Sequence, residues 1–365
     1  MSNNNEDCCS GGIEQLHVAI IGSGSGAFAC AIKAAEGGAR VTMIEGADII
    51  GGCCVNVGCV PSKILIRAAQ LAHQQRINPF DGIENNLPKI SRSLLMAQQT
   101  SRVEELRSAK YQNILDNNPA LTLLKGYARF KDENTLLVKK SDGLEEEIHA
   151  DRILIATGST PTIPPIKGLA DTPYWTSTEA LFAEELPDNL IVIGSSVVAI
   201  EIAQAYARLG TNVTILARHT LLYAEDPLLG EKLTECFEKE GIRVLNNTQA
   251  NDISYDTNSF TLDTNAGVLK ADKLLVSTGR HANTAQLGLE NVGIETDKSG
   301  AVLVNNKMET STTNIYAAGD CSNMPQFVYV AAAAGSRAGI NMTGGEARLD
   351  LSTMPAVIFT DPQVA

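Results

Sequence analysis

The first hydrophobic segments of the chain alternate with a glycine cluster and a run of small residues. Apolar positions at His17–Ile21 predict a buried strand, the small residues of Ala27–Ala35 predict a helix, and Val41–Ile44 predicts a second strand. A glycine-rich turn lies between the first strand and the helix. A strand, turn, helix and strand within about 30 residues have the size of a βαβ unit.

The same pattern begins again at Leu190. A strand at Leu190–Ile193 precedes a turn at Gly194–Ser196, a helix that runs through Leu209 and a strand at Val213–Leu216. Each of the two units is followed by a strand that ends in Thr-Gly, at 150–161 and at 271–284. The repetition predicts an α/β fold with two Rossmann-like nucleotide-binding domains.

The remaining segments predict smaller elements. The span 87–111 is amphipathic and helical, 126–148 alternates like a small antiparallel sheet, and 314–322 is a strand with a glycine turn. An alanine-rich helix is expected at 329–340. The last segment, 355–365, has the pattern of a strand that begins a further domain, so we expect that the chain is truncated.

Length and charge narrow the class of protein. The chain has 365 residues, which favours two or three domains, and a net charge of −13, which disfavours binding to nucleic acid or to an anionic membrane. Its N-terminus is polar and acidic, and no apolar run has the roughly 18 residues of a membrane span. We therefore expect a cytoplasmic protein without nucleic-acid or membrane partners.

The first glycine turn fits a dinucleotide site. Gly22, Gly24 and Ala27 match the pattern G-x-G-x-x-A, in which the glycines allow a tight turn and close approach of a pyrophosphate, and the small third residue allows helix–strand packing. The helix N-terminus supplies free N–H groups for the phosphates. Glu45, at the end of the second strand, is placed to accept hydrogen bonds from ribose hydroxyls.

The second turn is looser and ends differently. Gly194, Ser196 and Ala199 occupy the three turn positions, and Arg218 follows the second strand where the first unit has an acid. A carboxylate there repels a 2′-phosphate and an arginine attracts it, which favours NADPH over NADH. The neighbouring His219 could assist.

Cys54 and Cys59 carry the candidate chemistry. Closely spaced cysteines in a reducing compartment are more often catalytic or metal-binding than structural, so a redox pair, a metal clip and simple packing all stay open. A redox pair is favoured because zinc sites usually draw on a second cluster, which this sequence lacks. Pro61 predicts that Cys59 sits near a helix N-terminus, and Lys63 lies one turn on, so both would favour the thiolate.

The stretch GGCCVNVGCVPSK at 51–63 resembles the active-site segment of the pyridine nucleotide–disulfide oxidoreductases. The dinucleotide turn, the two Thr-Gly segments and YAAGD at 316–320 are similar to the other motifs of that family. The resemblance implies an FAD flavoenzyme that takes electrons from NADPH. It assigns to FAD Gly22, Gly24, Ala27, Glu45, Gly52, Thr157, Gly158, Gly319 and Asp320, and to NADPH Gly194, Ser196, Ala199, Arg218 and Gly279.

Within the family, GCVPSKILIRAAQ and PQFVYVAAAAGSRAGINMTGG are most similar to the members that reduce Hg(II) to Hg(0). This resemblance implies that the full-length protein is a homodimer. It also implies that Cys59 is the thiol next to the flavin and Cys54 the outer thiol, with both binding Hg(II) as substrate. It also implies that Lys63 pairs with Glu201 near the flavin, and that Tyr111 lines the mercury site. For Tyr111 a packed aromatic ring is the alternative.

Two departures from the family pattern change the expectations. Cys53 occupies a position where the family usually has threonine, and an interface domain is expected to follow Ala365. We expect a chain of this length to be poorly active.

Two alternative functions stay open. They are a disulfide reductase of the glutathione reductase or dihydrolipoamide dehydrogenase type, and an FAD-binding fragment without turnover. The predicted domains are a flexible arm at 1–14, an FAD domain at 15–185 and 313–350, an NADPH domain at 186–312 and the start of an interface domain at 351–365.

Overall fold

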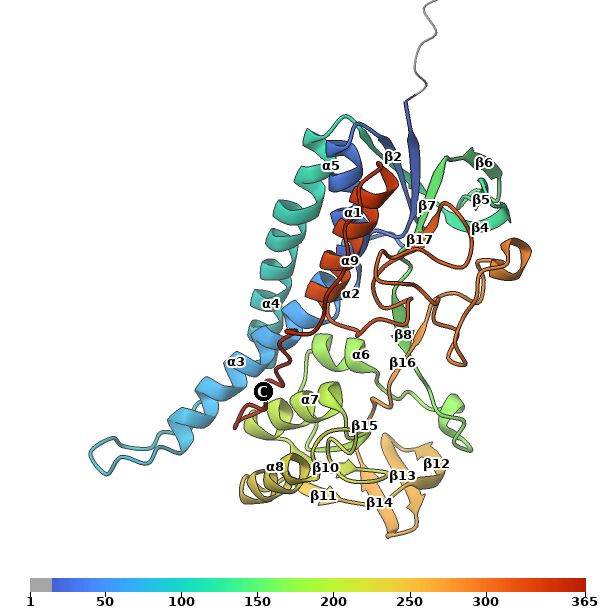
Figure 1. The fold of residues 1–365 in the computed structure, drawn as a ribbon. Coiled ribbons are helices and arrows are strands. Elements are labelled where there is room, and N and C mark those ends of the chain that lie inside the picture. The colour runs from blue at the N-terminus through green and yellow to red at the C-terminus, as the bar shows by residue number, and fades with distance from the viewer. Residues whose placement is uncertain (1–14) are drawn as a thin grey trace, which may run out of the picture.

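The computed structural model describes residues 15–365, and the predicted arm at 1–14, with Cys8 and Cys9, lies outside them (Figure 1). The first βαβ unit consists of β1 (His17–Ile21), α1 (Ser25–Glu36) and β2 (Arg40–Glu45). These strands belong to a five-stranded parallel sheet in the order β17-β7-β1-β2-β3. The other strands are β3 (Leu121–Lys125), β7 (Arg152–Ile155) and β17 (Ile315–Ala317).

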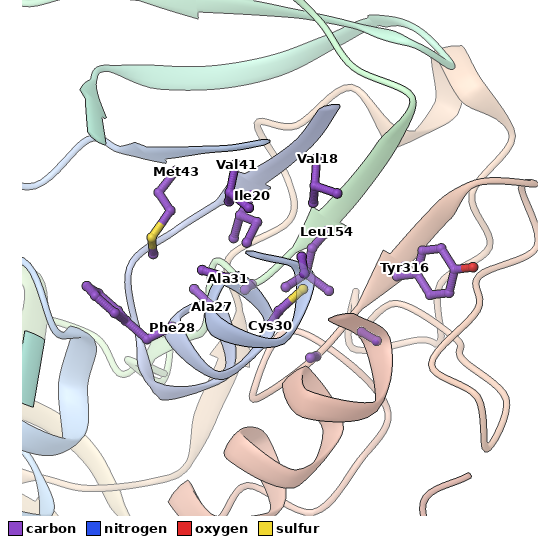
Figure 2. Packing of buried hydrophobic residues seen from close by; sticks show 14 of the residues in the cluster. Val18, Ile20, Ala27, Phe28, Cys30, Ala31, Val41, Met43, Leu154 and Tyr316 are labelled. Atoms are coloured by element: carbon purple, nitrogen blue, oxygen red, sulfur yellow. The ribbon is translucent and has the colours of Figure 1, made fainter. Parts of the chain in front are cut away.

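Small residues let two helices share one face of this sheet. Helix α1 packs against α9 (Val328–Met342), and Ala27 and Ala31 of the first lie in one core cluster with Ala334 and Ala338 of the second. Figure 2 shows this core, in which strand residues such as Ile20 and Leu154 point at α1. The antiparallel sheet β4-β5-β6 confirms the prediction for 126–148, with bounds Tyr127–Asp132, Thr135–Lys139 and Glu145–His149.

The second unit repeats this arrangement. It consists of β9 (Asn189–Ile193), α7 (Val197–Arg208) and β10 (Asn212–Leu216), in a parallel sheet of order β11-β10-β9-β15. An antiparallel sheet, β12-β13-β14, again accompanies it. The bounds of the other elements are α8 (Pro227–Lys239), β11 (Arg243–Leu245), β12 (Ala250–Asp256), β13 (Ser259–Thr264), β14 (Gly267–Ala271) and β15 (Lys273–Val276).

The same backbone contact closes both units. A Cβ at Gly22 would lie 2.3 Å from the carbonyl oxygen of Ala156, and a Cβ at Gly194 would lie 2.1 Å from that of Ser277. Both glycines have positive φ, at 112° and 134°. Each dinucleotide turn is therefore pressed against the end of the neighbouring strand, where only glycine fits. The predicted α/β fold with two Rossmann-like units is confirmed.

Two long helices of the chain, α3 (Cys59–Arg76) and α4 (Arg92–Arg107), pack against each other, and α3 also packs against the second unit. Helix α3 runs antiparallel to α4, as Figure 1 shows, and its Leu65 and Ala69 belong to the same core cluster as Ile200 of α7. The expected helix at 87–111 begins later than predicted, because Pro88 disfavours a helical conformation in the residue before it and Ser91 caps the helix by accepting a hydrogen bond from Leu94. It continues through a π-helical turn at Ser108–Gln112 into α5 (Asn113–Asn117).

The predicted strand at 355–365 is wrong. This segment has only an antiparallel bridge between Ile358 and Val364. A strand needs its N–H groups paired with a neighbouring strand, but those of Phe359 and Asp361 donate to side chains of α7. The remaining short elements are α2 (Gly52–Asn56), α6 (Ser177–Phe182), β8 (Ser159–Pro161), β16 (Arg280–Ala282) and 3₁₀ turns at Leu169–Asp171 and Leu289–Val292. None of the helices within 15–365 is long and apolar enough to cross a membrane.

Candidate active site

The short helix α2 places the cysteines on the first dinucleotide turn. Gly52, its first residue, has φ +69°, and a Cβ there would lie 2.7 Å from the Cα of Gly24. The amide of the preceding Gly51 donates to the carbonyl of Ser23 at 3.0 Å. The peptide backbone before the cysteine pair is therefore packed directly on the turn that precedes α1.

The thiols of Cys54 and Cys59 form an unequal pair. Hydrogen bonding to the neighbouring Cys59 thiol, reinforced by burial, raises the pKa of the Cys54 thiol far above its usual range. The same hydrogen bond, helped by the charge of Lys63 and opposed by burial, lowers the pKa of Cys59 to about 7. Cys59 was predicted to lie near a helix N-terminus, and it is the first residue of α3, where the helix N-terminus also favours a thiolate. Of the two thiols, Cys59 is therefore the one that loses its proton more readily.

Lys63 and Glu201 form the ion pair that the resemblance implied. Lys63 Nζ lies 2.5 Å from Glu201 Oε2, and Glu201 is only 4 % exposed. The lysine comes from the second turn of α3 and the glutamate from the first half of α7. The pair therefore ties the cysteine helix to the second nucleotide-binding unit.

Tyr111 lies in the π-helical turn at Ser108–Gln112 and faces the cysteine segment. Its ring packs edge-on against Phe28 at 4.9 Å between centroids, and its hydroxyl is 3.1 Å from Ser25 Oγ. Burial raises the pKa of its phenol, and both Cys54 and Cys59 add to that shift. The contact with Phe28 is the packed aromatic ring of the alternative prediction. The Tyr111 ring also lies against the cysteine segment, 3.1 Å from the position of a Cβ on Gly51.

The chain's other predicted FAD residues surround the same turn. Both oxygens of Glu45 are held, one by the Ser23 hydroxyl at 2.5 Å and one by the amide of Ala47 at 2.8 Å. Within residues 15–365 no side chain caps the N-terminus of α1, so its N–H groups are available to a diphosphate. Gly158 and Gly319 both have positive φ, and Asp320 accepts a hydrogen bond from Ser159 Oγ at 2.9 Å. These donors and the fixed carboxylates fit FAD.

Sequence reasoning missed a polar network beside these residues. Arg280 donates to the hydroxyl of Ser159 at 2.8 Å and to its carbonyl at 2.5 Å, and its guanidinium lies 3.7 Å from Cys53 Sγ. Burial raises the pKa of Cys53, while the charge of Arg280 acts in the opposite direction. The only sequence signal was the position of Arg280 directly after a Thr-Gly turn, which by itself does not show where the side chain points.

The second turn holds the residues that were predicted to bind NADPH. Gly194 and Ser196 precede α7, Ala199 is fully buried under the turn, and no residue within the described chain caps the helix with its side chain. Gly279, at the end of the adjacent strand, has φ +117°. Arg218 is exposed after β10, and the ring of His219 lies 4.9 Å from that of Tyr223. Arg218 is therefore free of burial and able to meet an anionic group at the strand end.

A permanently bound metal ion would need a group of ligand side chains. Among residues 15–365, no three His, Cys, Asp or Glu side chains are grouped so that they could hold a metal ion. Cys30 and Cys321 are fully buried within the first unit, and burial raises the pKa of both. The free thiols of the described residues that are not fully buried are Cys53, Cys54, Cys59 and Cys236, and of these Cys53, Cys54 and Cys59 lie in the segment at 51–63.

Comparison with known proteins decides the family. The family model for pyridine nucleotide-disulphide oxidoreductases matches residues 16–335. The chain belongs to this family. Mercuric reductases of this family use FAD and NADPH, so the cofactor prediction is confirmed at the level of the family.

Several relatives that share a high sequence identity with this chain are mercuric reductases. That of Shewanella putrefaciens is 74 % identical over 98 % of this chain, and that of Shigella flexneri is 59 % identical over 96 %. The chain spans about two thirds of these relatives, 66 % of the first and 63 % of the second. Among solved structures, the Cu(II) complex of the HOCl-induced flavoprotein disulfide reductase RclA from Escherichia coli matches with a TM-score of 0.86 and 29 % identity, over 96 % of this chain and 76 % of that one.

Proposed function

We propose that this chain forms the nucleotide-binding and thiol-bearing part of an enzyme that reduces Hg(II) to Hg(0) with NADPH. The observation that carries the proposal is the unequal pair of thiols, Cys54 and Cys59, packed on a dinucleotide turn. Its similarity to mercuric reductases, at 74 % identity to one of them, supports mercury as the substrate.

The two thiols suit a soft, linear-coordinating cation. Hg(II) prefers thiolate ligands, and each thiol must lose its proton when it binds a metal. Because the pKa of Cys59 is about 7, its thiolate is available at neutral pH and makes the first bond to Hg(II). Cys54 then releases the proton that it shares with Cys59 and becomes the second ligand. The substrate would thus be held between α2 and the start of α3.

The chain's own charges serve this step. Lys63 lies one turn after Cys59 on α3, and its charge lowers the pKa of Cys59, while Glu201 binds the lysine from the buried side.

Other side chains would bind the two cofactors. Glu45 and Asp320 would hold the FAD hydroxyls, and Arg218 would hold the 2′-phosphate of NADPH. When bound, FAD supplies the two-electron relay between a hydride donor and the metal. The overall balance is one NADPH and one Hg(II) to one NADP⁺, one proton and one Hg(0).

The remaining expectations follow from the same proposal. We propose that the enzyme of which this chain forms part is a cytoplasmic homodimer that acts on Hg(II) and has no nucleic-acid or membrane partner, in line with the net charge of −13 of this chain. Light scattering of that enzyme tests the dimer, because the measured mass should be twice the mass of one subunit.

The decisive experiment measures NADPH oxidation and released Hg(0) together. The purified protein should be yellow, and with Hg(II) it should release one Hg(0) for each NADPH consumed. Replacing either active thiol, by Cys54→Ala or Cys59→Ala, should abolish the release of Hg(0). The matched control is Cys236→Ala on α8, a thiol of the second unit, which should leave the rate unchanged. Hg(0) release that survives both active-thiol substitutions would contradict the proposal.

A second candidate is reduction of a disulfide. It is favoured by the likeness to RclA, which is described as a flavoprotein disulfide reductase. The same purified protein should be offered glutathione disulfide in place of Hg(II). Faster NADPH oxidation with glutathione disulfide would assign the site to disulfide reduction, and a yellow protein that oxidises NADPH with neither would be the FAD-binding fragment without turnover.

A further inference from the structure

The segment 358–361 is bound along one face of helix α7. Three buried polar residues of the helix, Glu201, Gln204 and Arg208, are spaced so that they face the same side. Gln204 Oε1 accepts from the amide of Asp361 at 2.9 Å, and Gln204 Nε2 donates to the carbonyl of Asp361 at 2.8 Å. Arg208 donates to the carboxylate of Asp361 at 3.0 Å. The position of the segment on the helix is thus set by several directional bonds.

Phe359 contacts both members of the Lys63–Glu201 ion pair. Its backbone N–H donates to Glu201 Oε1 at 2.8 Å, so each oxygen of this carboxylate has one partner. Its ring centroid lies 4.7 Å from Lys63 Nζ, within the range of a cation–π interaction. One residue therefore orients the carboxylate through its backbone and contacts the ammonium through its ring.

A lysine at this place needs such a contact. The Lys63 side chain is 37 % exposed, and the rotamer freedom of a long lysine side chain favours other orientations. The carboxylate of Glu201 attracts the Lys63 ammonium, but it contacts the ammonium only on its buried side. The ring of Phe359 supplies a second favourable contact that is lost if the ammonium turns away.

We propose that Phe359 is a positioning residue, which holds the ammonium of Lys63 against Glu201 next to the cysteine pair. The inference rests on the proposed function, because it concerns the charge that acts beside the thiols and FAD. A purely structural role fits the ring less well. Phe359 is 39 % exposed, whereas its neighbour Ile358 is 8 % exposed and belongs to the core cluster of α7. The packing of the segment is therefore carried by Ile358.

A double-mutant cycle measures the contact directly. Phe359→Leu should raise the unfolding equilibrium constant of the purified protein roughly fivefold more in the wild-type background than in the Lys63→Met background. Phe359→Tyr, which keeps the ring, should behave as wild type, and Ile358→Ala should destabilise both backgrounds equally. An equal effect of Phe359→Leu in both backgrounds would overturn the proposal.

A second readout covers the case in which Lys63→Met does not fold, since it leaves Glu201 buried without its cation. In the FAD-loaded protein, loss of the positioned ammonium should disfavour reduction of the flavin. We expect a roughly fivefold change in that equilibrium for Phe359→Leu, which corresponds to a midpoint potential about 20 mV more negative, and restoration by Phe359→Tyr. An unchanged potential in Phe359→Leu, or an equal shift in Phe359→Tyr, would overturn the inference.

These readouts separate the inference from the proposed function. Neither the unfolding cycle nor the midpoint potential uses Hg(II). If the protein proves to reduce a disulfide instead, the coupling between Phe359 and Lys63 is still measured. If it binds no FAD at all, the proposed function fails while the unfolding cycle still decides the inference.

Discussion

Gly52 lies with its backbone against that of Gly24, so closely that a Cβ on Gly52 would be 2.7 Å from the Gly24 Cα. The contact joins the start of the cysteine helix to the middle glycine of the first dinucleotide turn. It is the reason that the two motifs, well separated along the chain, form one site.

Gly52→Ala should therefore break this junction. The substitution meets two costs, a left-handed φ of +69° and an overlap with backbone that cannot turn aside. We expect a loss of about 3 kcal/mol or more in the free energy of unfolding, together with loss of FAD binding. Urea unfolding and flavin absorbance measure the two effects.

Gly143→Ala is the matched control for that substitution. Gly143 has a similar φ of +85°, but a Cβ there meets no atom within 4 Å. Its substitution should cost about 1 kcal/mol and leave FAD binding intact. Equal losses for the two alanine variants would show that the overlap with Gly24 does not matter.

The unequal thiols predict a pH dependence of alkylation. In the reduced protein, modification of Cys59 by iodoacetamide should increase with pH through a midpoint of about 7, because the thiolate is the reacting form. Cys54→Ala removes the hydrogen bond that stabilises this thiolate, so the midpoint should move up toward that of an ordinary thiol. Mass spectrometry of the peptide that carries Cys59 reports the midpoint. A midpoint that stays near 7 in Cys54→Ala would contradict the role of the hydrogen bond.

Arg218 predicts the choice between the two pyridine nucleotides. Arg218→Ala should raise the KM for NADPH by roughly 10- to 100-fold, the loss of a charge-assisted hydrogen bond of about 1.5–3 kcal/mol, and leave the KM for NADH unchanged. Arg218→Lys, which keeps the charge, should fall between the two. Steady-state kinetics with each nucleotide provide the measurement, and parallel changes for NADPH and NADH would rule out contact with the 2′-phosphate.

Arg208 predicts a difference between buried and exposed ion pairs. It is 6 % exposed and donates to Glu240 at 2.6 Å and 2.8 Å as well as to Asp361. Arg208→Ala leaves these carboxylates without their cation and should lower the free energy of unfolding by about 3–5 kcal/mol. Lys232→Ala is the control, because its pair with Glu235 on α8 is exposed on both sides and should give no measurable change. Similar urea midpoints for the two variants would contradict the importance of burial.

The sequence by itself determined the elements whose signals are local. The alternation of apolar runs, glycines and small residues predicted His17–Ile21 as a strand with the bounds that β1 has, and placed α1 and α7 to within a few residues. The duplication of the two units followed from the same signals, because a βαβ unit needs its glycine turn and apolar strands at fixed spacing. Pro61 likewise placed Cys59 near the start of a helix, because proline is well suited to a first helical turn.

Only the tertiary structure decided which residues meet. Glu201 is 138 positions from Lys63 and was linked to it through family resemblance alone. Nothing in the local sequence marked Arg280 as a neighbour of Cys53, or Phe359 as a neighbour of Lys63. The segment at 355–365 has an apolar pattern that suits a strand, yet its N–H groups are bound by α7 side chains. Local patterns state what a segment can form, whereas its partners depend on how distant parts of the chain pack, and packing decides where each hydrogen bond is made.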